Sequence, residues 1–197
     1  MPISTARADR HVADWSTRAG KVYWPKYLFH TAHVTVAVGA LSDNKLICRQ
    51  MQDKLIHDVA NPGAIASNVD ALKYVRLYFR PRTHFHLRTE GVKFRNDPNR
   101  QENQMSIPII LMFDFVKVVT QGGVGFSNGK MAHFEAKSGF DEMFFNSIPF
   151  ADVYHDGALS QTRIAEVNER RMSEVIMALF ALTMEVPDWR RFVVRDA

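Results

Sequence analysis

The apolar segments of this chain are short and irregularly spaced. Residues 107–113 are almost wholly apolar and predict a buried central strand, and the β-rich segment 74–79 predicts another strand. Apolar residues at near-helical spacing predict a short helix over residues 33–43. Because these segments do not alternate as regular strand–helix–strand units, the chain is predicted to have an α+β fold.

Weaker signals place further elements. The glycines of segment 122–125 predict a turn before a strand, and Asn128-Gly129 marks a second turn. Segment 140–147 suggests a helix. Additional short strands are predicted at residues 23–29, 46–47, 175–176 and 192–194, with a turn or two of helix at 51–59.

The 197 residues are 46% hydrophobic and 23% charged, which is typical of a globular domain and unlike a disordered chain. Residues 21–197 are predicted to form one domain, because no break in composition divides them. The polar residues 1–20 predict an N-terminal tail or a frayed first helix. No apolar run approaches a membrane span and no secretory signal is visible, so a cytoplasmic protein without a membrane partner is expected. The single cysteine, Cys48, excludes a disulfide framework.

Positive charge gathers in one segment. Between residues 76 and 100, seven basic residues accompany two acidic ones, and aromatic residues lie among them. Cations interleaved with stacking surfaces favour a phosphate-bearing partner, although an ordinary solvated surface gives the same pattern. The polar part of this segment, residues 89–105, predicts a mobile loop that can close over nucleic acid.

Several common chemistries lack their motifs here. The sequence contains no GxGxxG, GxxxxGK[ST] or GxSxG pattern. His30 and His33 are three residues apart, and His84 and His86 are two apart, but no HExxH motif or cysteine ligand accompanies them. No metal site is therefore predicted.

Two glutamates follow arginines in similar contexts, Glu166 and Glu174. Polar residues come after Glu166, whereas Glu174 leads into the apolar run 175–180 and would enter a buried strand. A carboxylate fixed there could serve catalysis beside a cleft. From the residues alone, a strand-capping glutamate paired with Arg170 or Arg171 remains an alternative.

Four short words of the sequence resemble, in order, those of one family. They are FHTAHV at 29–34 with KLI at 45–47, YVRLYFRPR at 74–82, FSNGKMA at 126–132, and RMSEVI at 171–176. Together they resemble the DarT family of ADP-ribosyltransferases, which modify DNA bases using NAD⁺. The resemblance spans roughly residues 28–195, and the YVRLYFRPR word is its most specific part.

This resemblance implies an ADP-ribosyltransferase fold, with two small packed sheets around a cleft for NAD⁺. It implies that His30 anchors the cofactor's ribose, that Tyr78 and Phe79 line the nicotinamide side, and that Glu174 is the catalytic glutamate. It also implies a toxin in bacterial or phage defence, with an antitoxin such as an ADP-ribosyl hydrolase. The expected NAD⁺ site comprises His30, Thr31, Ala32, Arg49, Tyr78 and Phe79, and the expected DNA contacts are Arg76, Arg82, His84, Lys93 and Arg95.

The chain departs from the family pattern at three places. Ala32 stands where the family has threonine, with Thr31 beside it. The family usually carries an arginine before the YV word, and residues 50–73 contain none. The PR word is followed by Thr83-His84-Phe85, where proline and methionine are frequent.

The chemistry fits the implied roles. Cleavage of the nicotinamide–ribose bond builds positive charge at the anomeric carbon, and a fixed carboxylate stabilises it. Modification of a base requires that the base be unstacked, which favours single-stranded DNA. Two other functions remain open: an ADP-ribosyltransferase for RNA or protein, and a nucleic-acid-binding relative with impaired catalysis.

Overall fold

The computed structural model describes residues 2–19, 21–51, 69–81, 83, 86, 89–98, 100, 104–131, 135–157, 160–177 and the backbone of 181–183. Its α-helices are α1 (Thr5–Ser16), α2 (Val34–Ser42), α5 (Phe115–Val119), α6 (Glu142–Ser147), α7 (Phe150–Val153) and α8 (Ile164–Arg170). Its 3₁₀ helices are η1 (Trp24–Lys26), η2 (Arg49–Met51) and η3 (Val69–Lys73). Its strands are β1 (Tyr27–His33), β2 (Lys45–Ile47), β3 (Val75–Tyr78), β4 (Pro108–Asp114), β5 (Val124–Ser127), β6 (Ser138–Gly139), β7 (Glu174–Met177) and β8 (Ala181–Thr183).

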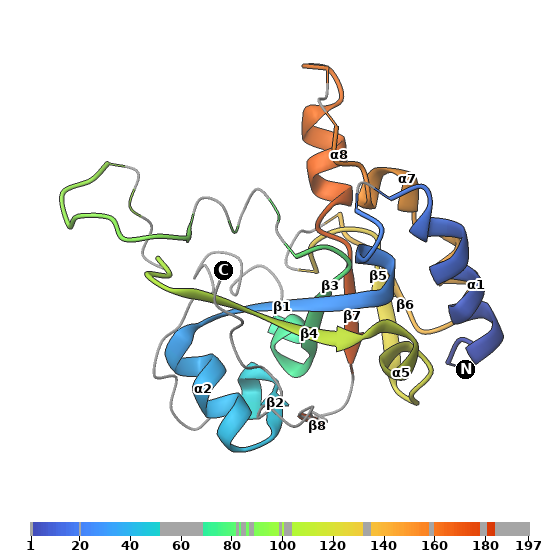
Figure 1. Cartoon of the computed structure of the whole chain (residues 1–197), viewed down its shortest axis with the longest axis horizontal. Helices are drawn as coiled ribbons and strands as arrows, with labels where there is room; N and C mark the ends of the chain where they lie inside the picture. The colour runs from blue at the N-terminus through green and yellow to red at the C-terminus, as the bar shows by residue number, and fades with distance from the viewer. Residues whose placement is uncertain are drawn as a thin grey trace, which may run out of the picture.

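Six strands form one sheet in the order β4-β1-β3-β7-β5-β6, and β2 pairs with β8 in a second, two-stranded sheet. Every pairing between these strands is antiparallel. Figure 1 shows α1, α5 and α7 at one end of the large sheet, α2 at the other end, and α8 rising beyond β7. Two sheets with flanking helices confirm the expected α+β class.

The central strands place apolar and polar side chains on opposite faces of the sheet. One face of β3, β7 and β5 joins the main hydrophobic core through Val75, Leu77, Val124, Phe126, Val175 and Met177. The other face carries Arg76 and Tyr78 of β3 and Glu174 and Ile176 of β7, which lie directly across from one another in the register. Because side chains alternate along a strand, the charged residues occupy the face away from that core.

Helix α1 is packed against the domain, so of the two expectations for residues 1–20, a tail or a frayed first helix, the structure shows a helix over residues 5–16. Ser4 caps the helix by accepting a hydrogen bond from the Arg7 N–H at 3.2 Å. Ala8 and His11 on its inner face are buried. The packed residue at the centre of this face is a histidine, so the apolar periodicity that announces an amphipathic helix is weak.

His11 lies inside an aromatic cluster. Its ring stacks on Phe115 at a centroid distance of 4.9 Å and meets the Phe150 ring at 4.3 Å. Its Nε2 shares a hydrogen bond of 3.0 Å with the Tyr154 hydroxyl. Burial, followed by the charge of Arg7, lowers the pKa of His11 to about 3. The imidazole is therefore neutral in the folded protein at neutral pH.

Strand β4 lies at the edge of the sheet, so the prediction of a central strand at 107–113 is wrong. Within the described residues β4 pairs with β1 alone. Leu111 and Phe113 are buried, whereas the alternate residue Met112 is half exposed. Pro108, the first residue of the strand, has no N–H to donate, which suits an edge. An apolar run alone does not separate an edge strand from a central one.

Other expected elements are confirmed within a residue or two. Helix α2 begins after His33, whose side chain accepts a hydrogen bond from the Thr35 N–H. Strands β2, β3, β5 and β7 and helix α6 also lie where expected, and Gly123 takes a positive φ of 77° in the turn before β5. Segment 23–29 is only partly a strand, because Pro25 lies in η1 before β1 starts. The helix expected at 51–59 lies almost wholly outside the described residues, and the strand at 192–194 wholly so.

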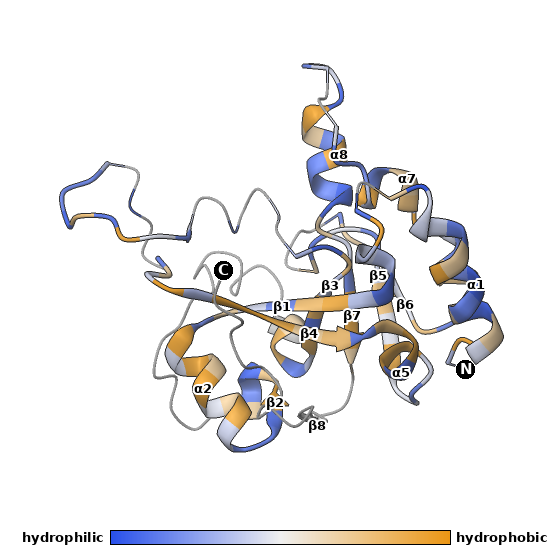
Figure 2. Cartoon of the chain, in the orientation of Figure 1, coloured by the Kyte–Doolittle hydropathy of each residue, from blue (hydrophilic) through white to orange (hydrophobic). Residues whose placement is uncertain are grey.

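Hydropathy follows this architecture. Figure 2 shows apolar colour along β4 and α2, and mostly hydrophilic colour on α8 and on the loop that projects beyond β1 and β4. Among the described helices, none is both long and apolar enough to cross a membrane.

Candidate active site

Glu174 opens β7 in the middle of the large sheet. Strands β3 and β5 flank it, and its partner across β3 is Tyr78. Its side chain is fully buried. Its backbone N–H donates a hydrogen bond to the Ser127 Oγ of β5 at 3.0 Å. The residue is therefore fixed by rigid strands on both sides, as electrostatic catalysis requires.

The two oxygens of the Glu174 carboxylate have different surroundings. Oε2 accepts a hydrogen bond from the Met131 N–H at 2.8 Å. Oε1 lies 3.5 Å from the Arg76 Nη1. The Tyr78 hydroxyl interacts with this carboxylate, but no group in the described part of the chain donates a hydrogen bond of good geometry to Oε1. A buried acceptor without a donor is costly. Oε1 is therefore available to accept a hydrogen bond from a hydroxyl group of a ligand.

The turn after β5 holds this carboxylate in place. Ser127 is fully buried, and its Oγ donates to the Gly129 carbonyl at 2.6 Å while it accepts from the Glu174 N–H. The same turn presents the Met131 N–H to the carboxylate. The FSNGKMA word therefore supports Glu174 through one hydroxyl group and one backbone amide.

Ser127→Ala is expected to lower the free energy of unfolding by about 1–3 kcal/mol, because it leaves two buried backbone groups without their shared partner. For a chain of this size, that corresponds to a fall of about 2–10 °C in the melting temperature. Thermal unfolding followed by circular dichroism measures the change. Ser138→Ala is the matched control, since Ser138 is exposed and lies directly across from Ser127 on β6. Equal melting temperatures for the two variants would contradict the role of Ser127.

His30 of β1 is joined to the strand that carries Arg76. Its Nδ1–H donates to the Arg76 carbonyl at 3.0 Å, which leaves Nε2 as a hydrogen-bond acceptor. Burial lowers the pKa of His30, with a smaller contribution from the charge of Arg76, against the effect of that hydrogen bond. His30 is therefore a neutral, fixed imidazole.

Two cations lie beside Glu174. Burial lowers the pKa of Arg76 and the Glu174 carboxylate raises it, with a net upward shift, so Arg76 stays charged. Burial, followed by the charge of Arg76, lowers the pKa of Lys130, while Glu174 and Glu169 oppose that change. Lys130 was not among the residues expected at the site, although it stands inside the FSNGKMA word. Two cations at a buried carboxylate suit an anionic ligand.

Tyr78 and Phe79 face opposite sides of the sheet, so the expectation that both line the cleft is corrected. Tyr78 shares the face of Glu174, and burial, followed by that carboxylate, raises its pKa, so the phenol stays neutral. Phe79 is fully buried in the main core, with its ring 5.2 Å from that of Phe150. Alternation of side chains along the chain separates the two neighbours.

The remaining residues expected to bind NAD⁺ are dispersed. Ala32 is buried in the main core, so its methyl group is not presented to a ligand. Thr31 has a buried Oγ1 to which the described residues supply no hydrogen-bond partner. Arg49 opens η2, in the segment that follows β2 of the second sheet. Of the expected NAD⁺ residues, the structure groups His30 and Tyr78 with Glu174.

The residues expected to bind DNA also separate into groups. Arg76 lies against Glu174 rather than on an open basic surface. Lys93 and Arg95 belong to the projecting loop. Arg82 and His84 lie outside the described residues.

Helix α8 is attached to the segments around Glu174. Arg170 donates to the Asn128 carbonyl at 3.0 Å, and Arg171 donates to the His155 carbonyl at 2.8 Å through Nη2. Neither arginine is the ionic partner of Glu174, which is Arg76. The alternative of a strand-capping glutamate paired with Arg170 or Arg171 is therefore not what the structure shows.

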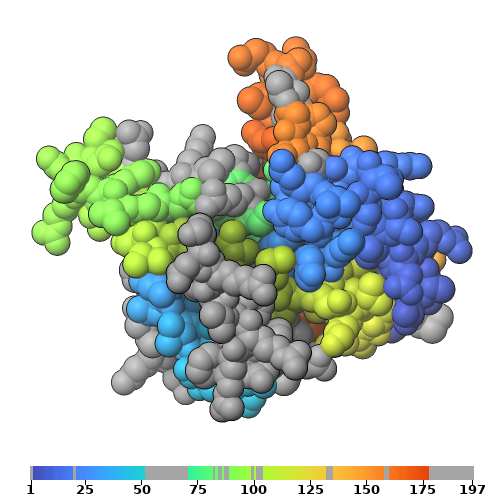
Figure 3. Space-filling model, viewed as in Figure 1, coloured from blue at the N-terminus to red at the C-terminus, as the bar shows by residue number. Residues whose placement is uncertain are grey.

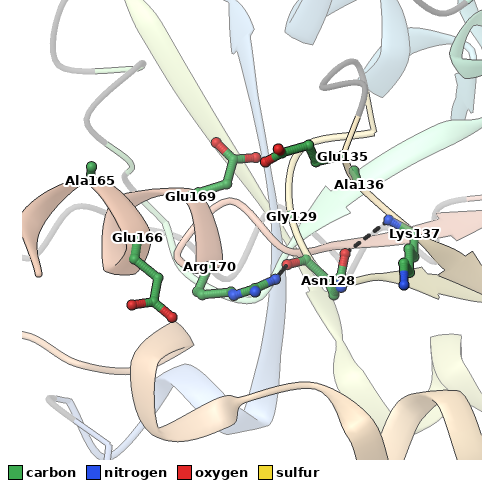
Figure 4. A pocket seen from close by; sticks show the side chains of 9 residues that line it. All are labelled: Asn128, Gly129, Glu135, Ala136, Lys137, Ala165, Glu166, Glu169 and Arg170. Atoms are coloured by element: carbon green, nitrogen blue, oxygen red, sulfur yellow. Dashed lines mark hydrogen bonds between the residues drawn. The ribbon is translucent and has the colours of Figure 1, made fainter.

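A pocket of about 590 Å³ lies between α8 and the turn after β5. Figure 4 shows Arg170 of α8 reaching toward Asn128 and Glu169 projecting toward Glu135, whereas Glu166 points away from Asn128. Glu169 Oε1 accepts a hydrogen bond from the Lys130 N–H at 3.2 Å. The pocket therefore adjoins the turn that supports Glu174, and Glu166 lines it from an exposed position. In the described residues, no group of three His, Cys, Asp or Glu side chains could hold a metal ion.

Sequence comparison alone reveals no relative: no protein-family model and no curated protein match the chain. Solved structures do match. Thermus sp. 2.9 DarT in complex with NAD⁺ aligns with 15% identity and a TM-score of 0.59, over 81% of this chain and 77% of that one. The same protein with ADP-ribosylated single-stranded DNA aligns with 14% identity and a TM-score of 0.63, over 81% and 77%. Its complex with carba-NAD⁺ aligns with 15% identity and a TM-score of 0.59, over 81% of this chain and 78% of that one.

The chain has the DarT fold. This confirms the ADP-ribosyltransferase architecture expected from the four words. In this DarT fold, β3 lies within the YVRLYFRPR word, the FSNGKMA word begins at the end of β5, and β7 begins within the RMSEVI word. These three neighbouring segments converge on the Glu174 carboxylate.

Proposed function

We propose that this protein transfers ADP-ribose from NAD⁺ to a nucleobase in single-stranded DNA. The observation that carries the proposal is the Glu174 carboxylate, which is buried and fixed between strands, and whose Oε1 accepts no hydrogen bond from the described residues. The DarT fold supports it, since the similar structures were solved with NAD⁺ and with ADP-ribosylated single-stranded DNA.

In this proposal, residues on the polar face of the sheet hold NAD⁺. Glu174 Oε1 accepts a hydrogen bond from the 2′-hydroxyl of the nicotinamide ribose, and His30 Nε2 accepts one from another ribose hydroxyl. Tyr78 offers an aromatic surface to the nicotinamide. Arg76 and Lys130 supply positive charge for the diphosphate. NAD⁺ is a substrate here, and no metal is invoked.

The reaction breaks the bond between the ribose anomeric carbon and the nicotinamide nitrogen. The bonding electron pair leaves with nicotinamide, and the positive charge of the pyridinium disappears as charge develops on the ribose. A base nitrogen then bonds to the anomeric carbon and loses its proton to solvent or to a nearby acceptor. The Glu174 carboxylate stabilises the positive ribose, and its burial strengthens that effect because the local dielectric is low.

The pocket beside α8 is the proposed place for the acceptor base. It adjoins the turn that supports Glu174, and carboxylates of Glu166 and Glu169 lie at its edge. Carboxylates accept hydrogen bonds from the amino and imino groups of bases. Residues 160–173, which include α8, would then present the target base to the anomeric carbon.

The four words also support a biological proposal. Their resemblance to the DarT family supports a role as a cytoplasmic toxin or phage-defence effector, opposed by an antitoxin protein such as an ADP-ribosyl hydrolase. Expression of the wild-type chain in bacteria should then arrest growth, and expression of Glu174→Gln should not. Coexpression of a DNA ADP-ribosyl hydrolase should restore growth. Equal growth arrest by both chains would contradict this role.

The test of the activity is a competition between acceptors. NAD⁺ labelled on its adenosine half is incubated with the protein and a mixture of single-stranded DNA, RNA and an unrelated protein. Label on DNA supports the proposal, and mass spectrometry of the oligonucleotide identifies the base. Label on RNA or on protein would mean that this acceptor, and not DNA, is the substrate. Intact NAD⁺ with no labelled acceptor would favour a binding module that has kept the fold.

A further inference from the structure

A loop over residues 91–98, here called the arm, is fastened at its base. A β-bridge joins Glu90 to Met105, with hydrogen bonds from the Met105 N–H to Thr89 and from the Gly91 N–H to Met105 at 2.6 and 2.8 Å. The buried Gln104 Nε2 lies 2.7–3.0 Å from the carbonyls of residues 89, 90 and 91. The side chain thereby binds three consecutive carbonyls and fixes where the arm starts.

The base of the arm adjoins the proposed active site. The His86 carbonyl accepts a hydrogen bond from the Glu90 N–H at 2.9 Å. The His86 ring meets the Tyr78 ring edge-on, with centroids 5.1 Å apart. Tyr78 lies directly across from Glu174. From Glu90 to Phe94, the chain can reach at most roughly 13 Å. A single strand of DNA bound at Glu174 therefore has the arm on one side of it.

The tip of the arm exposes large apolar side chains between cations. Val92 and Phe94 are each 82% exposed, and Lys93 and Arg95 alternate with them. Figure 3 shows the arm standing away from the rest of the described surface. An exposed aromatic ring on a projecting loop, flanked by cations, has the chemistry of a platform for stacked bases.

We propose that the arm is a docking surface for single-stranded DNA, on which a base flanking the modified nucleotide stacks against Phe94. Lys93 and Arg95 lie near the phosphates on either side of that base. Bases of a duplex are stacked on one another and cannot cover the ring, so the surface selects single strands. The proposal rests on the proposed function, because only that function requires the bound DNA to run from the arm toward Glu174. Binding of DNA to the arm itself needs no NAD⁺.

Binding of a fluorescein-labelled oligothymidylate without NAD⁺, followed by fluorescence anisotropy, tests the platform. Phe94→Ala is expected to raise the Kd about tenfold, within the range for loss of one base–aromatic stack. Phe94→Trp should restore binding, because it keeps an aromatic face. Met143→Ala is the matched control, since Met143 on α6 is 80% exposed and apolar, and its Kd should equal that of the wild type.

The salt dependence of the same binding tests the cations. Replacing Lys93 and Arg95 together with alanine should reduce the slope of log Kd against log salt by about 1.4, because each single-strand phosphate contact contributes about 0.7. An unchanged slope would contradict their role.

Three outcomes would overturn the inference. The first is an unchanged Kd for Phe94→Ala. The second is an equal loss of duplex and single-strand binding by Phe94→Ala. The third is a wild type that sediments as a dimer and a Phe94→Ala variant that sediments as a monomer, which would make the arm a contact between copies of this chain. Failure of the proposed function looks different. If the wild type labels DNA while Phe94→Ala binds normally, only the inference fails; if the wild type binds DNA through Phe94 but labels nothing, only the proposed function fails.

Discussion

Replacing Glu174 with glutamine is expected to lower ADP-ribosyl transfer by at least about a hundredfold, the scale of losing one major electrostatic contact to a transition state. Glutamine is nearly isosteric, so the Met131 amide can still be paired by the side-chain oxygen. The negative charge that stabilises the positive ribose is lost. Since that charge matters most in the transition state, the Kd for NAD⁺ should change only a few fold. Single-turnover transfer from labelled NAD⁺, together with calorimetric binding, separates the two effects.

Glu166→Gln is the matched control for this variant. Glu166 lies on α8, is exposed and lines the pocket, whereas Glu174 is fully buried. In the high dielectric of an exposed position, a carboxylate stabilises a distant charge weakly. The control should therefore lose much less activity. If Glu166→Gln proved the more damaging variant, the catalytic carboxylate would lie on α8 instead.

Acidification is expected to destabilise the fold through His11. The pKa of His11 is about 3 in the folded protein and about 6.5 in an unfolded chain. The unfolded state therefore binds the proton first, so the stability that the neutral ring provides is complete above about pH 6.5 and falls as the pH drops toward 3. Each pH unit in this window costs about 1.4 kcal/mol, or roughly 5 kcal/mol in total. Urea unfolding curves recorded from about pH 7 to about pH 4 measure the slope.

His11→Phe is the control for this dependence, because it keeps an aromatic ring that cannot take up a proton. At neutral pH the variant should be less stable by about 1–3 kcal/mol, since the buried Tyr154 hydroxyl loses its partner. Its stability should decline less steeply in acid. Parallel slopes for the wild type and the variant would mean that His11 is not the responsible group.

Local signals predicted the fold where the chain follows local rules. The helix at α2 and the strands at β3 and β7 carry their own periodicity and turns, and they appear where expected. Predictions failed where long-range packing decides. The position of β4 at the edge depends on which strands pair, and within residues 107–113 only Pro108 is a local signal for an edge. A first helix was one of two alternatives for residues 1–20, but its packing into the domain was not foreseen, because its buried face is centred on a histidine whose hydrogen-bond partner Tyr154 lies more than a hundred residues away.

The candidate site shows the same division. Glu174 was singled out because it precedes an apolar run, and its catalytic role was implied by the family resemblance. The structure places it buried between β3 and β5, and the catalytic role stays a prediction. The role expected for Phe79 failed because this residue follows β3 and packs in the main core, whereas Tyr78 shares the face of Glu174. Support from Ser127 and Lys130 was hidden because their contacts join segments more than 40 residues apart in the sequence. A residue-by-residue reading of the FSNGKMA word is the signal that could have found both.

The clasp formed by Gln104 and the bridge at Glu90 separates the surface proposed to capture DNA from the site around Glu174. The clasp fixes both ends of the arm, so a change in the length of the arm is not transmitted to the sheet. Doubling the length of a flexible loop raises its closure free energy by only about 0.6 kcal/mol. Insertions or exchanges between residues 92 and 100 should therefore alter which DNA strands the arm binds, while the geometry at Glu174 stays unchanged. An enzyme divided in this way can acquire a new target by replacing a peripheral segment, without passing through an inactive intermediate.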